Sequence, residues 1–509
     1  MNKKILPIFF LLILSPVFSQ ESGSVEFPNN ANSTFIISAF DFNITGRTRP
    51  DAVIYNGEFK EGEEIQGQAN LEKYIRDKTQ LLLNQRVLES VWIDYSTGQV
   101  REDGKIPVNL VINVVDTWNF AIIPTPRYSS NTGLELILKL RNYNFLGTMN
   151  PLTINLGYRY DQNKRSSGFF EQEANVPFRA FGYFWNFKFD NYFDYRPSAD
   201  EIFYFKNTSG ISMELPVKNT TFTFGFDESF ILNEENEEQY QKLYGEYQVG
   251  FYMSSKPYVS WEIPIGIEIG SYGDLIYTPE INAVFNHEFP RWSLKEHLKG
   301  PFLTFKHTLG FNRVDWLGNY RRGFDVAAEN SYTYDFYRKS HDKDPLSVDY
   351  TVSGKGYFIF TEFFGMSAFL QYRQWFCHDP DYYFPAGDAL RGILDNDLHA
   401  DYMLSLNLDF PFRILKFAPS QWFNRPKLHA AEFDLHLSPI IDLALYHDPS
   451  TGTSFDFSNI LVTGGFELII FPAAMRSLYI RFSFGWNFVE QANNPQGSRE
   501  IFIGIGHHY

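Results

Sequence analysis

Large apolar and polar residues alternate along several segments near the C-terminal end of the chain. A period of two is typical of a β-strand whose two faces meet different surroundings. The clearest segments are 402–410, 433–445, 478–488 and 501–505, and Gly464-Gly465 interrupts a weaker one at 461–471. The pattern therefore predicts a series of antiparallel strands, each with one large apolar face and one polar face.

The polar face of these strands decides what surrounds them. It carries ionisable residues, among them Asp409, Asp434, Asp442 and Arg481. A water-filled lumen accepts such charges, while the opposite rows of Leu, Ile and Phe face lipid tails. A soluble β-sandwich is the alternative, and it needs a second sheet to cover the apolar face. We expect a mainly β fold, a transmembrane antiparallel β-barrel.

Thirteen segments further upstream have the same strand character, which brings the count from the pattern to eighteen. They are 120–128, 134–143, 152–160, 181–193, 203–213, 220–231, 244–253, 259–269, 281–289, 302–311, 324–337, 350–360 and 366–376. Two segments rich in Asp, Lys, Asn and Gly, 161–174 and 339–348, are predicted to be outer loops.

The N-terminal end predicts export from the cytoplasm. Lys3 and Lys4 precede the apolar run 5–14, and a cleavage site before Gln20 makes residues 1–19 a signal peptide. No later apolar stretch reaches the length of about 18 residues that a membrane helix needs. The chain holds 52 Phe and 31 Tyr, which fits the aromatic girdles of a membrane barrel. Cys377 is the only cysteine, so no intramolecular disulfide is possible.

Charge and motifs limit the chemistry that the chain can perform. A net charge of −16 argues against nucleic acid as a partner. The sequence shows no nucleophile elbow, no phosphate-binding glycine loop and no paired metal-ligand spacing. We therefore expect no enzymatic activity, no cofactor and no metal.

Residues 34–116 follow a different pattern from the rest of the chain. A strand at 35–44 precedes a short helix beginning at Pro50, and 71–87 has helical spacing. Two strands follow, at 91–95 and 108–114. The predicted order is β-α-α-β-β, which describes a small α+β domain ahead of the barrel.

This order resembles a POTRA domain, the periplasmic module of the BamA/TamA outer-membrane family. The segment Asn43-Ile44-Thr45-Gly46-Arg47-Thr48-Arg49 resembles the strand-to-helix entry of that module, and Lys60-Glu61-Gly62-Glu63 resembles its loop. The resemblance implies one POTRA-like periplasmic domain over 34–116 and a barrel over 117–509. It also implies about sixteen barrel strands and a location in the bacterial outer membrane.

A second resemblance marks a candidate functional loop. The segment 385–393 is similar to the family motif on the long sixth extracellular loop, which folds back into the lumen; the matching residues are Gly387, Asp388, Leu390, Arg391 and Gly392. The chain has Pro385-Ala386 in place of a glycine pair and Ile393 in place of an aromatic residue. The alternative motif, Arg322-Gly323-Phe324, keeps the aromatic residue.

An arginine inside a lumen needs carboxylate partners in a forked geometry. Asp409 and Asp442 project inward by strand parity, and the resemblance implies the same acidic positions. We expect Arg391 to pair with Asp442 and secondarily with Asp409, which would hold the loop against the inner wall. Alternatively, Arg391 lies in a solvated loop tip and Asp442 is one lumen residue among many.

The end of the chain resembles a barrel-assembly signal, through Phe502, Gly504, Gly506 and Tyr509. In the family, the first and last strands form a seam through which client strands pass, and 142–147 resembles a motif near the second strand. The resemblance implies a factor that assembles or translocates polypeptides, with lipid, client proteins and periplasmic chaperones or accessory proteins as partners. The alternative function is a passive diffusion channel with a periplasmic appendage.

Overall fold

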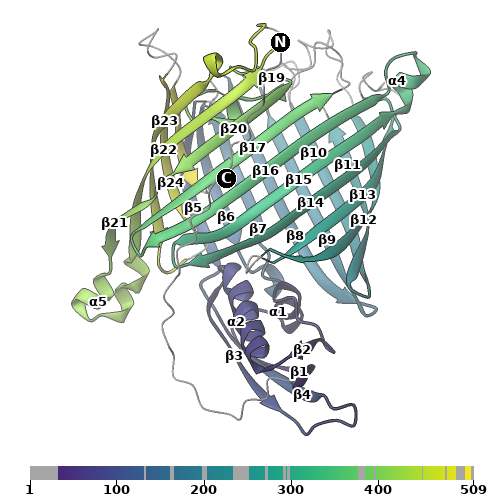
Figure 1. Ribbon diagram of the computed structural model, residues 1–509. Helices are drawn as coiled ribbons and strands as arrows, with labels where there is room; N and C mark the ends of the chain where they lie inside the picture. The colour runs from purple at the N-terminus through teal and green to yellow at the C-terminus, as the bar shows by residue number, and fades with distance from the viewer. Residues whose placement is uncertain are drawn as a thin grey trace, which may run out of the picture.

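The computed structural model describes most of the chain from residue 33 onward. The segments outside the description are 1–32, 131–132, 161–164, 198–202, 233–250, 270–272, 290–293, 295–297, 377–383, 395–396, 450, 476–477, 489–498 and 506–509. The predicted signal peptide and Cys377 lie outside the described residues. The described part forms a small N-terminal module below a closed β-barrel (Figure 1).

The N-terminal module is a four-stranded sheet covered by two helices. Its elements are β1 (Thr34–Thr45), α1 (Pro50–Asn56), β2 (Glu64–Gln66), α2 (Gln68–Asn84), β3 (Leu88–Thr97) and β4 (Ile106–Asp116). The sheet order is β2-β1-β4-β3, with β1 parallel to β4. Leu71 and Leu82 of α2 pack against Ile37, Leu110 and Ile112, and all five are fully buried. The sequence pattern predicts every element except the three-residue strand β2.

The barrel strands run antiparallel to their neighbours around a closed sheet. They are β5 (Phe120–Ser129), β6 (Gly133–Asn142), β7 (Leu152–Tyr160), β8 (Ser166–Ala180), β9 (Tyr183–Tyr195), β10 (Phe203–Val217), β11 (Thr220–Leu232), β12 (Phe251–Glu268), β13 (Asp274–His287), β14 (Phe302–Leu317), β15 (Tyr320–Asp335), β16 (Leu346–Thr361), β17 (Phe364–Phe376), β20 (Tyr402–Asp409), β21 (Phe412–Phe417), β22 (Phe433–His447), β23 (Leu461–Pro472), β24 (Ile480–Asn487) and β25 (Arg499–Ile505). Because β20 and β21 both pair with β17 and β22, they are two halves of one strand.

The described barrel therefore has eighteen strands, and the expectation of about sixteen is wrong. The count of eighteen from the alternation pattern agrees in number but contains two compensating errors. It divides β12 into two segments, and it assigns most of β8 to an outer loop. Polar residues in β8 are compatible with a strand because they face the lumen, where Asn155 donates a hydrogen bond to Glu171 at 2.5 Å. The predicted loop at 339–348 is also too long, since α4 ends at Ser340 and β16 begins at Leu346.

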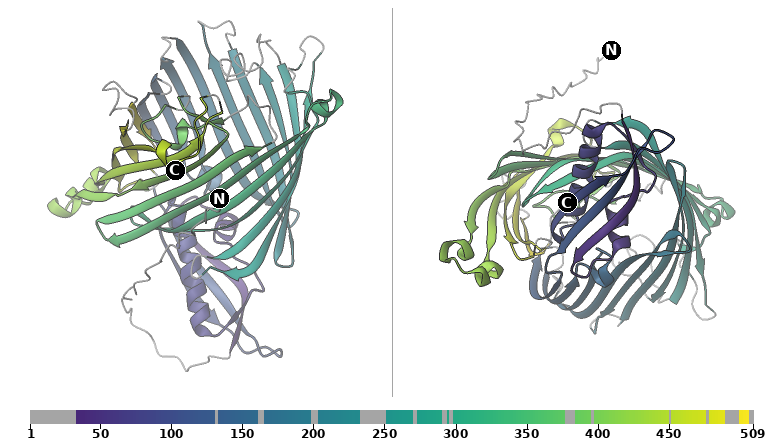
Figure 2. Two further views of the ribbon diagram at one scale, coloured as in Figure 1. Left: turned by 45° about the horizontal axis from the view of Figure 1, so that its top comes forward. Right: turned by 90° about the horizontal axis from the view of Figure 1, so that it is seen from below.

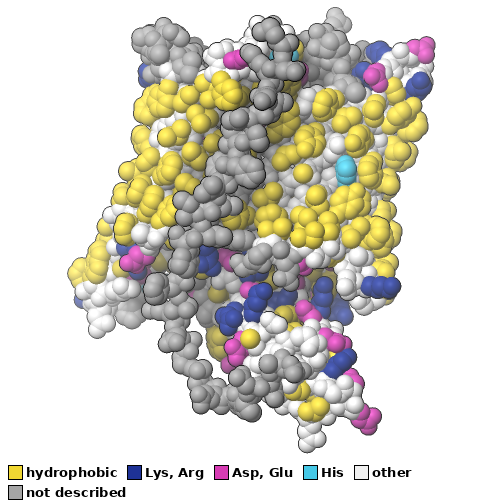
Figure 3. All heavy atoms as spheres, viewed as in Figure 1, with side chains coloured by type: hydrophobic (Ala, Val, Ile, Leu, Met, Phe, Trp, Pro, Cys, Tyr) yellow, Lys and Arg dark blue, Asp and Glu magenta, His cyan; other side chains and the backbone are white. Residues whose placement is uncertain are grey.

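The two faces of the barrel wall differ in the way that the alternation predicts. On β6, Leu134, Leu136 and Leu138 point outward and are 43–53% exposed, whereas Glu135 and Lys139 point inward and are at most 8% exposed. Hydrophobic side chains cover the outer wall in the view of Figure 3. A closed sheet with this outer surface excludes the sandwich alternative and has the surface of a transmembrane barrel. None of the described helices has the length and apolar character required to cross a membrane.

Candidate functional site

The segment 384–400 folds back into the lumen between β17 and β20. Two short strands, β18 (Phe384–Pro385) and β19 (His399–Ala400), pair with each other and enclose the turn η3 (Gly387–Ala389). Leu390 and Ile393 are buried at 1% and 4% exposure against the inner wall. The loop, called the lumen loop below, is therefore packed, and a solvated loop tip is excluded.

Arg391 lies at the centre of the lumen loop and is only 1% exposed. Its Nε donates to Asp442 Oδ2 at 3.0 Å, and its Nη2 donates to Asp442 Oδ1 at 2.5 Å. The backbone N–H of Arg391 donates to the same carboxylate at 2.8 Å. Nη1 donates to Asp409, so one guanidinium joins the loop to β22 and β20. The paired hydrogen bonds from the guanidinium to the two oxygens of Asp442 are the strongest form of a charge-assisted contact.

A third acid completes the cluster, and the sequence analysis did not select it. Glu467 of β23 lies 3.6 Å from Arg391 Nη1 and 3.0 Å from Arg481 Nη1 of β24. Two arginines thus face three carboxylates, Asp409, Asp442 and Glu467, on the inner wall. Strand parity alone could have found Glu467, because it alternates with Phe466 and Leu468 on a strand whose pattern the glycine pair interrupts.

The remaining motif residues have distinct positions. Gly387 and Leu390 are buried in the lumen loop, whereas Asp388 is exposed and does not join the arginine cluster. The alternative motif Arg322-Gly323-Phe324 lies inside strand β15, which pairs with β14 and β16. It therefore cannot fold into the lumen.

Gly392 brings the lumen loop into contact with the last two strands. Its φ is +104°, and a Cβ atom there would lie 2.7 Å from the Trp486 backbone. Gly485 of β24 is equally close to the loop, because a Cβ atom added there would lie 2.7 Å from the Arg391 carbonyl carbon. Only glycine permits this close approach of two backbones. The N–H of Gly392 donates to the Glu500 carboxylate of β25 at 3.0 Å.

Among the described residues, the barrel closes through a short junction between β25 and β5, called the seam below. The described residues form two seam pairs, Phe502–Ser129 and Ile503–Tyr128. By contrast, seven pairs join β24 to β25, and ten join β5 to β6. Gly506 and Tyr509, which the sequence analysis assigned to the seam, lie outside the described residues.

Two prolines weaken the β5 edge of the seam. Ser130 N–H donates across the seam to Ile501 O at 3.2 Å, while Asn119 O accepts from β6 on the other edge. Successive residues of a strand point their backbone N–H and C=O groups to opposite edges. The backbone groups of the even-numbered residues of β5 therefore point toward the seam. Pro124 and Pro126 are even-numbered and have no N–H to donate. The seam edge of β5 therefore lacks two hydrogen-bond donors.

The lumen side of the seam is held by an aromatic ring between two cations. The guanidinium carbon of Arg481 lies 4.4 Å from the centre of the Phe502 ring, and that of Arg127 on β5 lies 5.4 Å from it. Gly504 leaves room for the ring, since a Cβ there would approach it to 2.6 Å. Phe502 thus bridges the two strands that meet at the seam.

The N-terminal module contacts several turns and strand ends at the mouth of the barrel, and two of these contacts lie far apart in the strand order. Asn144, in the turn between β6 and β7, donates to Thr48 Oγ1 at 2.7 Å and to Asp116 at 3.2 Å. Elsewhere, the Arg86 guanidinium lies 4.0 Å from the Trp316 ring near the end of β14 and donates to Gly318 O, in the turn between β14 and β15, at 3.2 Å. Seen from below, the module lies over the mouth of the barrel (Figure 2). The Gly46–Thr48 and Asn144–Gly147 segments, noted separately in the sequence, therefore meet.

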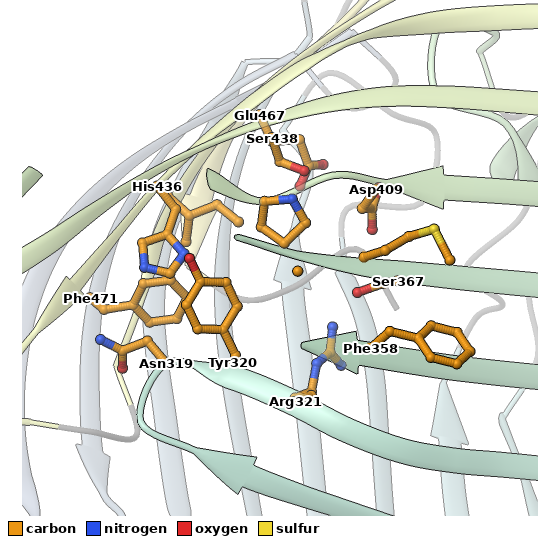
Figure 4. Close-up of a pocket in the computed structure, with 14 residues that line it drawn as sticks. Asn319, Tyr320, Arg321, Phe358, Ser367, Asp409, His436, Ser438, Glu467 and Phe471 are labelled. Atoms are coloured by element: carbon orange, nitrogen blue, oxygen red, sulfur yellow. The ribbon is translucent and has the colours of Figure 1, made fainter. Parts of the chain in front are cut away.

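A cavity in the lumen adjoins the arginine cluster (Figure 4). Asp409 and Glu467 line one side of it. On the other side, His436 of β22 lies 4.9 Å from Tyr320 of β15, measured between ring centres. Since β15 and β22 are not neighbours in the sheet, this contact narrows the lumen near the N-terminal module.

Comparisons with known proteins give structural likenesses only. No family model and no curated protein matches the chain. The fold is similar to CdiB from Acinetobacter baumannii at 13% identity and a TM-score of 0.47, over 92% of this chain and 73% of that one. BamA from Haemophilus ducreyi lacking POTRA domains 1–3 gives 12% identity and a TM-score of 0.39, over 93% and 85% of the two chains. CdiB from Escherichia coli gives 9% and 0.41, over 96% and 93%.

Proposed function

We propose that this protein is a BamA/TamA-type factor of the bacterial outer membrane that inserts or translocates polypeptides through its seam. The short seam is the observation that carries the proposal. A net backbone hydrogen bond is worth about 0.5–1.5 kcal/mol, so two seam pairs cost far less to separate than a junction of seven. A client strand that pairs with the freed edges replaces the lost hydrogen bonds, and the reaction needs no nucleotide or cofactor.

The N-terminal module supplies a second edge for a client or an accessory protein. Strand β3 is the last strand of its sheet and pairs with β4 alone. Trp92 on this strand is 49% exposed. Main-chain pairing to an exposed edge is a common way of binding an extended peptide. In this proposal the module is POTRA-like, faces the periplasm and receives polypeptides before they reach the barrel.

A passive diffusion channel fits the lumen less well. The lumen loop is buried inside the barrel, with Arg391 held by acids from three strands. The N-terminal module also lies across the mouth of the barrel (Figure 2). Both features oppose a wide and static water path, which a diffusion channel requires.

A reversible lock of the seam tests the proposal. Tyr128 and Ile503 face each other across the seam and are 40% and 38% exposed. Cysteines at opposite positions of an antiparallel pair are within reach of a disulfide. The variant Tyr128→Cys/Ile503→Cys is made in a Cys377→Ser background and reconstituted into liposomes. Insertion of a urea-unfolded outer-membrane β-barrel protein is then followed by its protease resistance, before and after reduction.

The matched control locks the other edge of the same strand. Ile122 and Leu140 are a paired position between β5 and β6, and Ile122→Cys/Leu140→Cys introduces the same bond there. We expect the seam lock to abolish stimulated insertion and reduction to restore it, while the control lock leaves insertion unchanged. Equal insertion by both locked variants would contradict the seam mechanism. A large static conductance with no stimulated insertion would identify a channel instead.

A further inference from the structure

One hairpin at the lower edge of the barrel differs from the other turns there. Residues 418–432 connect β21 to β22 and form the helix α5 (Pro419–Phe423) and the turn η4 (Pro426–Ala431). The turns between β8 and β9 and between β10 and β11 each have only two residues. The segment 412–431, called the tip below, projects sideways from the barrel on the side of the N-terminal module (Figure 1). Its sideways position takes it away from the lumen and the client path.

The tip continues the lipid-facing surface of the barrel. Phe412 stacks on Phe364 of β17 with 4.3 Å between ring centres, and Phe417 meets Trp422 edge-on at 5.1 Å. Trp422 and Phe423 at the end of the tip are 57% and 66% exposed. Such exposed large rings at the border of an apolar wall are typical of the membrane interface, where an aromatic ring meets headgroups and tails together.

The charge of the tip is opposite to that of the whole chain. Residues 412–431 include Arg413, Lys416, Arg425 and Lys427 but no acidic residue, whereas the chain has a net charge of −16. Arg413 lies 3.7 Å from Glu362 in the neighbouring turn, and the other three are exposed. Basic residues beside exposed aromatic rings bind anionic membrane surfaces through combined electrostatic and apolar contacts.

The tip is held in its shape by one carboxylate at its base. Glu432 accepts hydrogen bonds from the hydroxyl and the N–H of Ser420 and from the His429 ring. The Ser420 hydroxyl, followed by His429, holds the pKa of Glu432 below its usual range. Glu432 O also accepts from Ala473 N–H at 2.9 Å, which joins the tip to the turn after β23. The aromatic and basic groups are therefore presented on a preformed support.

From this geometry we infer that the tip is an interfacial anchor that binds the anionic phospholipid headgroups of the leaflet on the side of the N-terminal module. Trp422 and Phe423 enter the headgroup region, while Arg425 and Lys427 contact phosphates. The inference rests on the membrane placement of the proposed function but not on client insertion. The anchor fixes the tilt and depth of the barrel wall three strands away from the seam.

A short-range lipid quencher tests where the end of the tip lies. In a Cys377→Ser background, Phe423→Cys is labelled with an environment-sensitive fluorophore, and the full chain is reconstituted into liposomes. The liposomes contain phosphatidylethanolamine and phosphatidylglycerol with brominated acyl chains. The matched control carries the label at Trp92→Cys, an exposed aromatic position on β3 of the N-terminal module. We expect brominated lipid to quench the label at 423 by roughly half and to leave the label at 92 almost unchanged.

Charge reversal then separates headgroup binding from simple proximity. The double variant is Arg425→Glu/Lys427→Glu, and the control with the same change of net charge is Lys60→Glu/Lys73→Glu in the N-terminal module. We expect the tip variant to lose most of the quenching at 423 in liposomes with phosphatidylglycerol, and the control to keep it.

Each outcome decides the inference separately from the proposed function. Quenching at 423 no greater than at 92, or equal quenching in both charge variants, would overturn the anchor. Protection of 423 from quenching only when periplasmic proteins are added would show a protein-docking surface instead. A seam lock that has no effect on client insertion would leave the anchor standing, because the quenching measurement needs no client.

Discussion

Removal of the Arg391 side chain is the perturbation whose magnitude the structure defines best. Asp442 is fully buried and faces the guanidinium through two hydrogen bonds, at 3.0 and 2.5 Å. In Arg391→Ala it keeps one hydrogen bond from the loop backbone but loses its counter-charge. Loss of one partner of a buried ion pair costs about 3–5 kcal/mol, because the remaining charge stays desolvated. Asp409 and Glu467 lose the same cation, which adds repulsion between the acids.

The conservative variant separates charge from geometry. Arg391→Lys keeps a positive charge but cannot form the fork, so it should recover part of the loss and remain about 1–3 kcal/mol less stable than the natural chain. The control is Arg373→Ala on β17. Arg373 lies 3.6 Å from Asp349, and both side chains are more than a third exposed. The Arg373 guanidinium also lies 4.6 Å from the centre of the Phe384 ring, so its loss should cost about 1–2 kcal/mol, still less than the loss of Arg391.

The assay is urea unfolding of the reconstituted barrel, followed by its heat-modifiable migration in gels. We expect the unfolding midpoints to fall in the order natural chain, Arg373→Ala, Arg391→Lys, Arg391→Ala. The exchange Arg391→Asp/Asp442→Arg should recover part of the stability, because the guanidinium stays within the same acidic cluster. Equal midpoints for Arg391→Ala and Arg373→Ala would refute the idea that the cluster holds the lumen loop, as would a double exchange no better than either single change.

Three further substitutions test the contacts of the lumen loop, the seam and the N-terminal module. Glu500→Gln removes the charge from the hydrogen bond between the lumen loop and β25, so protease cleavage of the loop should increase while the free energy of unfolding falls by only about 1 kcal/mol. Phe502→Ala removes the ring beside Arg481, and disulfide formation across the seam should become slower and incomplete as the strands separate. Arg86→Ala removes the contact with Trp316, worth about 1–2 kcal/mol, and hydrogen exchange should accelerate in the turn between β14 and β15.

Much of the barrel could be predicted because a lumen and a lipid phase impose opposite demands on alternate residues. The inward positions of Asp409 and Asp442 followed from parity alone, since a one-residue shift would have placed both carboxylates in lipid. Strand β8 was missed because the lumen tolerates Glu and Asn, so a polar segment such as Ser166–Ala180 resembles a loop. The resemblance implied about sixteen strands where the described barrel has eighteen, and the pattern reached about eighteen only because one missed strand offset one divided strand.

The contacts between distant parts of the chain could not be predicted from the pattern. Asn144 and Thr48 are separated by 96 positions, and their hydrogen bond depends on how the N-terminal module meets the barrel. Glu500 had no distinguishing signal, because an acid on the last strand is compatible with any lumen position. Prolines at 124 and 126 were visible in the sequence, but the edge that they face follows only from the hydrogen bonds of β5.

The lumen loop contacts the wall unequally, and in the proposed mechanism this inequality predicts which contact breaks first when the seam opens. Arg391 is joined to β20, β22 and β23 by ion pairs, and removing it costs about 3–5 kcal/mol. The contact of the loop with β25 includes the hydrogen bond from the Gly392 N–H to Glu500, worth about 1.5–3 kcal/mol because the acceptor is charged. If β25 moves away from β5 as the proposed function requires, we expect the Gly392–Glu500 contact to break before the arginine cluster. The loop would then remain as an inner support for β20 to β24.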